Sequence, residues 1–128
     1  MKEIYNYYFM NIIEKVNFKT EGYQIVNITK DIQELVNKHS FEKGLVNLSI
    51  LHTSASLTIQ ENASKDVLND ISTFLNNLAP ETENYLHSVE GPDDMPAHLK
   101  TLVTNTNLTL SVISNKLVLG LWQGIYLC

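Results

Sequence analysis

The sequence predicts one α+β domain with mostly antiparallel sheets and with helices gathered toward one side. At 128 residues the chain is long enough for a single domain with a hydrophobic core and too short for two comfortable ones. Stretches that alternate between apolar and polar side chains, as half-buried strands do, occur in both halves of the chain. Two stretches between them carry apolar residues at helical spacing, and this arrangement of strands and helices is typical of the α+β class.

The first expected unit is a β hairpin. Residues 7–18 alternate loosely, residues 20–22 supply a turn, and residues 23–26 form a short return strand. Thr29 then has the character of a helix N-cap, and the helix should end before Gly44. One face of this helix carries Ile32, Leu35, Val36 and His39.

Two adjacent strands are expected over residues 45–52 and 53–61. His52 comes last on the apolar face of the first strand. It needs a hydrogen-bond partner or a metal there, because leaving it buried and unpaired would cost about 1 to 3 kcal/mol. A core histidine bonded to a hydroxyl fits this pattern as well as a functional one. The second strand has a hydroxyl-bearing face that includes Ser54 and Ser56, and such a face is also typical of ordinary solvated strands.

A long helix is expected to begin at Asn62 or Ser64 and to end before Pro80. Its N-terminus, with free N–H donors and the positive end of the helix dipole, adjoins Glu61. Its apolar stripe consists of Val67, Ile71, Phe74, Leu75 and Leu78.

The last part of the chain should form a short helix over residues 96–103 and two strands over residues 108–113 and 117–127. Gly120 and Gly124 fall inside the final strand. Two glycines there indicate a bulge or a close approach by another backbone segment.

The stretch 86–100 is the densest in side chains that transfer protons or bind metal. These side chains are His87, Glu90, Asp93, Asp94, His98 and Lys100. The simplest alternative is an acidic loop that caps the short helix, with Asp93 or Asp94 near the N-cap and Pro96 in the first turn. Two histidines flanking three carboxylates exceed what a solvated turn requires, which favours a functional site.

Composition excludes several classes of function. A net charge of −5 argues against a nucleic-acid-binding face. All nine basic residues are lysines, so this chain cannot bind phosphate through a bidentate guanidinium.

No apolar run reaches the length of a membrane span, and the N-terminus lacks the apolar core of a signal peptide. The single cysteine cannot form an intrachain disulfide, and we therefore expect a cytoplasmic protein.

Five motifs occur in order along nearly the whole chain. They are His52-Thr53-Ser54-Ala55-Ser56-Leu57-Thr58, Glu61-Asn62, Tyr85-Leu86-His87, Glu90-Gly91-Pro92-Asp93-Asp94-Met95-Pro96-Ala97-His98-Leu99-Lys100 and Trp122-Gln123-Gly124-Ile125-Tyr126. Together they resemble the YjbQ family, whose members are known as secondary thiamine-phosphate synthases.

The resemblance implies a compact, β-sandwich-like domain over residues 1–128 that assembles as a homotrimer. It implies a cluster of histidines in a pocket near the subunit boundary, with His52, His87 and His98 as metal ligands or acid–base residues and Asp93 beside them. Family members usually continue past the Trp-Gln-Gly motif into a further strand that carries arginines. We therefore expect that a C-terminal strand of the family is missing from this chain.

The activity that the resemblance implies is a transferase reaction. It couples a pyrimidine pyrophosphate to a thiazole phosphate, releases pyrophosphate and gives thiamine phosphate, and it is expected to be secondary to another activity. A divalent ion, zinc or magnesium, would hold the pyrophosphate, while His98 stabilises the leaving group and His87 acts as the general acid. The residues expected to bind the phosphorylated substrate are Ser54, Ser56, Glu61, Asn62 and Lys100.

Two other interpretations of the same residues remain open. In one, the protein is a non-enzymatic trimer whose histidines bind a metal or a small metabolite. In the other, the histidines and the acidic loop bond across the subunit interface and fix the assembly. The three histidines stand 35 and 11 residues apart, which is no local ligand motif, so their spacing alone does not decide between these interpretations.

Overall fold

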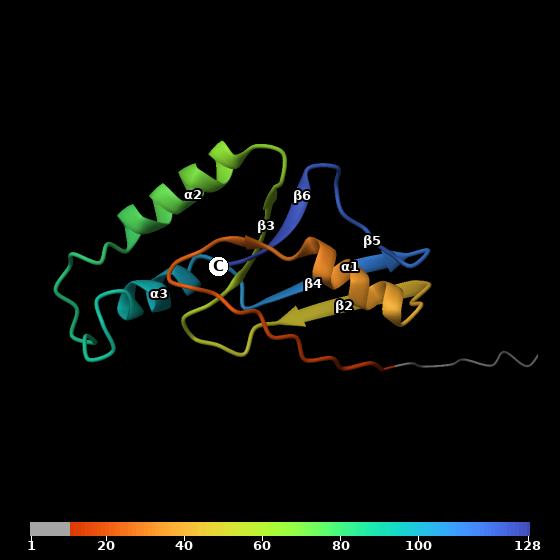
Figure 1. Cartoon of the computed structure of the whole chain (residues 1–128), viewed down its shortest axis with the longest axis horizontal. Coiled ribbons are helices and arrows are strands. Elements are labelled where there is room, and N and C mark those ends of the chain that lie inside the picture. The colour runs from red at the N-terminus through yellow and green to blue at the C-terminus, as the bar shows by residue number, and fades with distance from the viewer. Residues whose placement is uncertain (1–10) are drawn as a thin grey trace, which may run out of the picture.

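The computed structural model describes residues 11–128, which form three helices and six strands (Figure 1). The elements are β1 (Val26–Asn27), α1 (Thr29–Lys38), β2 (Lys43–Ser49), β3 (Leu57–Glu61), α2 (Lys65–Leu78), α3 (Asp94–Thr101), β4 (Asn107–Ile113), β5 (Lys116–Leu117) and β6 (Gln123–Leu127). The strands form two antiparallel sheets, one in the order β1-β6-β3 and the other in the order β2-β4-β5.

One hydrophobic core joins the two sheets and α1. Its buried members are Ile28, Ile32, Leu57, Leu110, Ile125 and Leu127. Leu57 and Ile125 come from the first sheet, Leu110 comes from the second sheet, and Ile32 comes from α1. Since both sheets contribute to the same core, the predicted α+β class with antiparallel sheets is confirmed.

The predicted N-terminal hairpin is wrong over the described residues, and its residues 7–10 lie outside them. Residues 11–25 form no strand, and β1 pairs with β6 instead of with the segment before it. The segment is held by side chains, because Glu14 accepts hydrogen bonds from Lys38 and His39 at 2.7 and 2.8 Å. Alternation predicts that a segment can lie half-buried, but it does not choose the partner strand.

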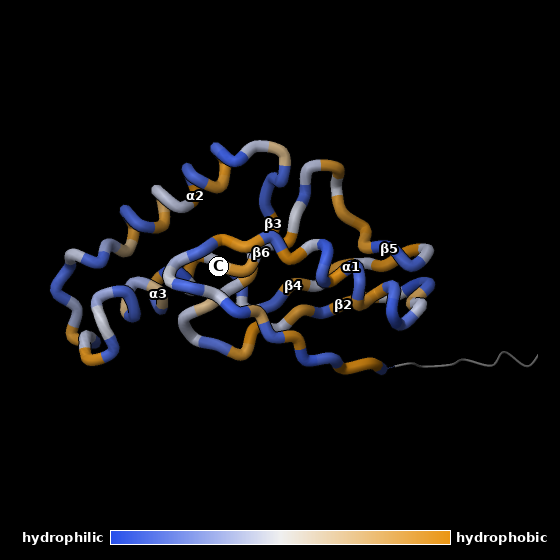
Figure 2. Tube along the Cα trace, in the orientation of Figure 1, coloured by the Kyte–Doolittle hydropathy of each residue, from blue (hydrophilic) through white to orange (hydrophobic). Residues whose placement is uncertain are grey.

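The two longer helices follow their local signals. Helix α2 begins after Ser64, whose hydroxyl accepts a hydrogen bond from the Asp66 amide at 3.2 Å, and it ends just before Pro80. Hydrophobic and hydrophilic segments alternate along α2 in Figure 2, as expected for a helix with one apolar face. Helix α1 begins at Thr29, so the predicted N-cap position is wrong by one residue: Ile28 occupies it, without a side-chain capping bond. Within residues 11–128 no helix has both the length and the hydropathy of a membrane span.

Three predicted strands have different boundaries in the structure. The strand predicted over residues 45–52 is β2 and ends at Ser49, and the strand predicted over residues 53–61 is reduced to β3. The strand predicted over residues 117–127 is divided between β5 and β6, which belong to different sheets. A turn separates these two strands, in which the Gly120 amide donates to the side-chain oxygen of Gln123 at 2.7 Å. Residues 52–56 are therefore a loop that leads into β3.

Candidate metal centre

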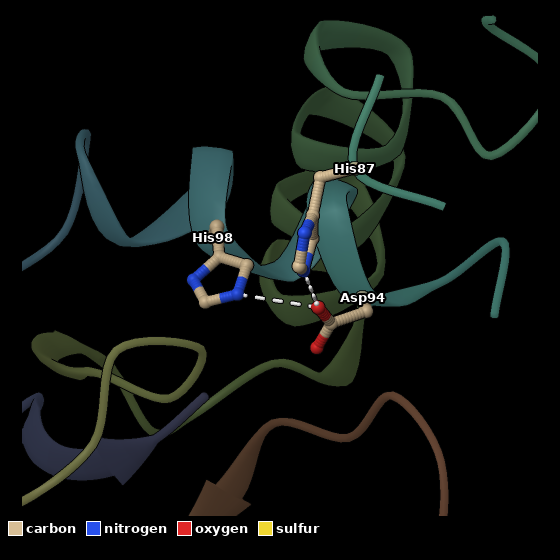
Figure 3. Close-up of side chains that lie close together, drawn as sticks. All are labelled: His87, Asp94 and His98. Atoms are coloured by element: carbon tan, nitrogen blue, oxygen red, sulfur yellow. Dashed lines mark hydrogen bonds and ion pairs between the residues drawn. The ribbon is translucent and has the colours of Figure 1, made fainter. Parts of the chain in front are cut away.

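Three side chains of the stretch 86–100 converge on one another (Figure 3). His87 comes from the loop between α2 and α3, whereas Asp94 and His98 come from α3 itself. The Oδ2 atom of Asp94 lies 2.6 Å from Nε2 of His87 and 3.2 Å from Nε2 of His98. One potential ligand atom from each residue lies within 4.8 Å of the other two, which makes the group a candidate metal centre.

The start of α3 decides which carboxylate faces the histidines. Gly91 has a φ of +115°, a backbone conformation that glycine adopts readily, and α3 begins after the turn that it makes. Asp93 occupies the N-cap position without a side-chain capping bond and is exposed. Asp94 lies in the first turn, four residues before His98, so the two side chains share one face of the helix.

A backbone carbonyl fixes the ring of His98. Nδ1 of His98 lies 2.9 Å from the carbonyl oxygen of Thr53. Since a carbonyl oxygen can only accept a hydrogen bond, Nδ1 carries a proton, and Nε2 is directed at Asp94. Nε2 then either donates a proton to the carboxylate or offers a lone pair to a cation. Histidine metal ligands are commonly oriented in this way, by a hydrogen bond from their other ring nitrogen.

The site is partly open to solvent. The side chains of His87, Asp94 and His98 are 47%, 21% and 30% exposed. The hydrogen bond from His87 is the main cause that lowers the pKa of Asp94 below its ordinary value. The two imidazole rings meet edge to face, with centroids 5.5 Å apart. A small ligand could therefore reach all three residues without a large rearrangement.

The donor set fits a transition metal. Two ligands that each lie about 2.1 Å from a tetrahedral zinc ion are about 3.4 Å apart, which is close to the 3.2 Å between Asp94 and His98. The 2.6 Å between Asp94 and His87 is a hydrogen-bond distance, and it would have to lengthen by about 0.8 Å for both to bind one ion. Two imidazoles and one carboxylate also match the ligand number of catalytic zinc sites, which keep a fourth position open. Imidazole suits zinc better than magnesium, which prefers oxygen ligands.

The structure does not bring His52 into this group. His52 is exposed in the loop before β3, where its Nδ1 accepts a hydrogen bond from the Ser54 amide at 3.1 Å and lies 3.0 Å from the Ser54 hydroxyl. Ser56 is only 1% exposed, and its hydroxyl is hydrogen-bonded to the hydroxyl of Thr104 at 2.6 Å. Of the two predicted serines, Ser54 is the more accessible.

Glu61 and Asn62 lie at the end of β3 opposite to the loop that holds His52. The amide group of Asn62 donates to the carbonyl oxygen of Gln123 at 3.2 Å, and the carbonyl oxygen of Glu61 accepts a hydrogen bond from the Tyr126 hydroxyl at 3.1 Å. Both contacts tie β3 to β6. The structure does not place either residue in the His87–Asp94–His98 group.

Lys100 is directed into the protein. The residue is 7% exposed, its ammonium donates to Oδ1 of Asn76 at 2.7 Å, and Nζ lies 3.9 Å from the centroid of the Tyr23 ring. Burial lowers the pKa of the Lys100 ammonium.

The predicted set of metal ligands did not include Asp94. Its spacing of four residues from His98 was a signal in the sequence that the two side chains share one face of a helix.

A cavity of about 340 Å³ lies elsewhere, between residues 11–18, α1 and β2. Its lining is mostly aliphatic and includes Ile32, Val46 and Leu48. None of the three residues of the candidate metal centre lines it, so the centre is a surface site of α3 and the loop before it.

Comparison with known protein sequences gives consistent matches. The family model described as UPF0047 protein YjbQ-like matches residues 14–128. A UPF0047 protein of Synechocystis sp. is 43% identical over 109 residues, which are 84% of this chain and 74% of that protein. The UPF0047 protein YjbQ of Escherichia coli O157:H7 is 38% identical over 109 residues, which are 85% of this chain and 78% of that protein.

Solved structures give the same result. A protein of the YjbQ/UPF0047 family from Clostridium acetobutylicum superimposes with a TM-score of 0.75 at 34% identity, covering 81% of this chain and 78% of that one. A conserved hypothetical protein from Thermus thermophilus gives a TM-score of 0.72 at 36% identity, covering 80% of this chain and 78% of that one.

Proposed function

The chain belongs to the family of UPF0047 YjbQ-like proteins, and from this membership and the candidate metal centre we propose that it is a metal-dependent enzyme acting on a phosphorylated small molecule. The convergence of His87, Asp94 and His98 carries the proposal, since their ligand atoms lie within 4.8 Å of one another. We propose zinc as the preferred ion, with magnesium as the alternative, and a cytoplasmic location.

The reaction that we propose joins a pyrimidine pyrophosphate to a thiazole phosphate. The bond between the pyrimidine methylene carbon and oxygen breaks, and its electron pair leaves with the pyrophosphate. The thiazole nitrogen then forms a new bond to that carbon, which gives thiamine phosphate. Negative charge develops on the leaving group, so donors fixed at that position would contribute most of the catalysis.

The residues of this chain have distinct roles in the proposal. His98, oriented by the Thr53 carbonyl, would hold the ion together with Asp94 and His87. The ion would supply Lewis-acid stabilisation of the departing pyrophosphate. His87 would donate from its other ring nitrogen to the same group, and the hydroxyl of Ser54, in the adjoining loop, would contact phosphate. The sequence contains no arginine, so a guanidinium cannot hold the pyrophosphate, and a metal cation at this position would take that role.

Metal binding is tested by calorimetric titration of zinc and magnesium into chelator-treated protein. Asp94→Ala and His98→Ala should abolish tight zinc binding, because each removes one of three ligands. Asp93→Ala is the matched control, since Asp93 is the adjacent carboxylate but is exposed and makes no contact with either histidine. Equal zinc affinity in Asp93→Ala and Asp94→Ala would contradict the proposed ligand set.

Activity is tested by incubating the two phosphorylated substrates with zinc-loaded protein and measuring thiamine phosphate and pyrophosphate. Turnover should depend on the ion and should be lost in His98→Ala while the circular dichroism spectrum is retained. Product formation at the wild-type rate in His98→Ala would refute the assignment of this site to the reaction.

A second candidate function is a non-enzymatic, homotrimeric protein that binds a metal or a metabolite. The exposure of the centre and of the apolar side chains beside it favours this interpretation. Leu86 and Val89, which flank His87, are fully exposed in the single chain. Large aliphatic side chains so placed are typical of an interface between subunits. Light scattering of Leu86→Ser should give a smaller mass than the wild type if this surface joins the copies, and zinc binding without turnover would favour the binding function.

A further inference from the structure

We propose that Lys100 is a positioning residue of the candidate metal centre. Its buried ammonium holds α3 between α2 and the segment that precedes β1, and this placement keeps Asp94 and His98 close to His87. The inference rests on the proposed function only where metal binding is concerned. It gives Lys100 a role different from the predicted contact with substrate phosphate.

Helix α3 depends on tertiary contacts for its position. It has eight residues, which is shorter than helices that are stable by themselves, and its N-cap side chain makes no capping bond. Only Pro96 and Lys100 among its residues are buried. Lys100 is therefore one of the two buried side chains by which α3 packs against the rest of the protein.

The ammonium of Lys100 makes two directional contacts with different segments. It donates to Oδ1 of Asn76 on α2 at 2.7 Å and lies over the ring of Tyr23, with Nζ 3.9 Å from the centroid. Helices α2 and α3 are in contact with each other. Within residues 11–128 no carboxylate lies within ion-pair distance of Lys100. The charged group that acts on this cation, Glu81, lies beyond ion-pair distance. The contacts with Asn76 and Tyr23 are therefore the direct ones, and losing either would leave the buried charge less well compensated.

The same helix is fixed on its other side by the loop before β3. Nδ1 of His98 is bonded to the carbonyl oxygen of Thr53 in that loop. Thr104, which follows α3, donates to the carbonyl oxygen of Lys100 at 2.9 Å, and its hydroxyl lies 2.6 Å from the hydroxyl of Ser56 in the loop. Lys100 lies two residues after His98 and six after Asp94. Release of the ammonium contacts would let α3 shift as a unit, which would change the hydrogen bond of His98 and its distance to Asp94 together.

The test compares Lys100→Met with Lys30→Met. Methionine keeps the length of the apolar stem and removes the charge, and Lys30 is a matched control because its side chain is 89% exposed. The first readout needs no metal: it is the nitrogen-15 NMR signal of the protonated Nδ1 of His98. The second is zinc affinity, measured by competition with a chromophoric chelator. Lys100→Met should remain folded, change the His98 signal and weaken zinc binding about 10-fold or more, whereas Lys30→Met should change neither.

Two variants of Tyr23 provide an independent test, and they decide the question if Lys100→Met does not fold. Tyr23→Phe removes the hydroxyl that bonds to Ser72 but keeps the aromatic face under the ammonium, so it should leave the His98 signal unchanged. Tyr23→Leu removes this face and should alter the His98 signal. A lower melting temperature with an unchanged His98 signal in Lys100→Met or Tyr23→Leu would mean that the contact only stabilises the fold, and it would overturn the inference. Absence of zinc binding in the wild type would refute the proposed function. In that case the His98 signal alone would test whether Lys100 positions His98.

Discussion

Replacement of Ile125 by alanine should destabilise the protein strongly. Ile125 is 0% exposed and lies in the centre of β6, within the core that joins both sheets and α1. The substitution removes three carbon groups, which at about 0.8 kcal/mol each correspond to about 2.4 kcal/mol of lost transfer free energy. The cavity left behind adds to this cost, so we expect a total loss of about 3 to 4 kcal/mol in the free energy of unfolding.

The backbone around Ile125 gives the reason for the additional cavity cost. The carbonyl oxygen of Ile125 accepts a hydrogen bond from the Ile28 amide at 2.8 Å, and its own amide donates to the Thr29 hydroxyl at 2.8 Å. These bonds fix β6 against the segment that joins β1 to α1, and β6 also pairs with β3 on its other side. The surrounding residues therefore cannot move inward to fill the space.

The assay is urea unfolding followed by circular dichroism. Ile113→Ala is the matched control, because Ile113 is an isoleucine at the end of β4 that is 54% exposed, and its loss should be about 1 kcal/mol or less. Equal losses in the two variants, or a loss below about 1 kcal/mol in Ile125→Ala, would refute the assignment of Ile125 to the centre of a shared core.

Three further predictions concern pH, thiol chemistry and backbone conformation. The hydrogen bond from His87 lowers the pKa of Asp94, so the stability that this carboxylate contributes is present above about pH 4 and is lost as the pH falls through its lowered pKa. Urea midpoints between pH 6 and pH 3 should therefore decline less in Asp94→Asn than in the wild type, and an identical decline would contradict the contact. Burial raises the pKa of the Cys128 thiol to about 11, and a hydrogen bond with Ser56 opposes this shift. Alkylation by iodoacetamide near pH 8 should thus be far slower in the folded than in the unfolded protein, and slower still in folded Ser56→Ala. Equal alkylation rates in the folded and unfolded wild type would show that the thiol is accessible. Gly91→Ala should lower the free energy of unfolding by about 1 kcal/mol or more, because alanine is strained at a φ of +115°, and an unchanged melting temperature would exclude this conformation.

Local signals in the sequence predicted the helices well. Ser64 and Pro80 bound α2 in the structure, as their capping and helix-breaking chemistry indicates. Pro96 lies within the first turn of α3, and Asp93 stands at its N-cap position. These features depend on residues close together in the chain, so a single sequence contains the information needed to find them.

The pairing of strands was less predictable. Alternation indicated strands in residues 7–26 and a continuous strand over residues 117–127, but β1 pairs with β6, and the second stretch contributes β5 to one sheet and β6 to the other. Alternation alone indicates which side chains prefer burial. It does not indicate which strand will pair with the segment, because that choice depends on residues far apart in the sequence.

By itself, the sequence determined the α+β class, the position of the longer helices, the family resemblance and the stretch in which the candidate site lies. Only the tertiary structure decided which groups of that stretch meet, because His87 and the carbonyl oxygen of Thr53 reach α3 from separate loops. It also decided that Lys100 is buried against Asn76 and Tyr23, although a lysine in an acidic stretch is usually exposed. The physical reason is that charge, spacing and propensity act along the chain, whereas burial and coordination depend on distances through space.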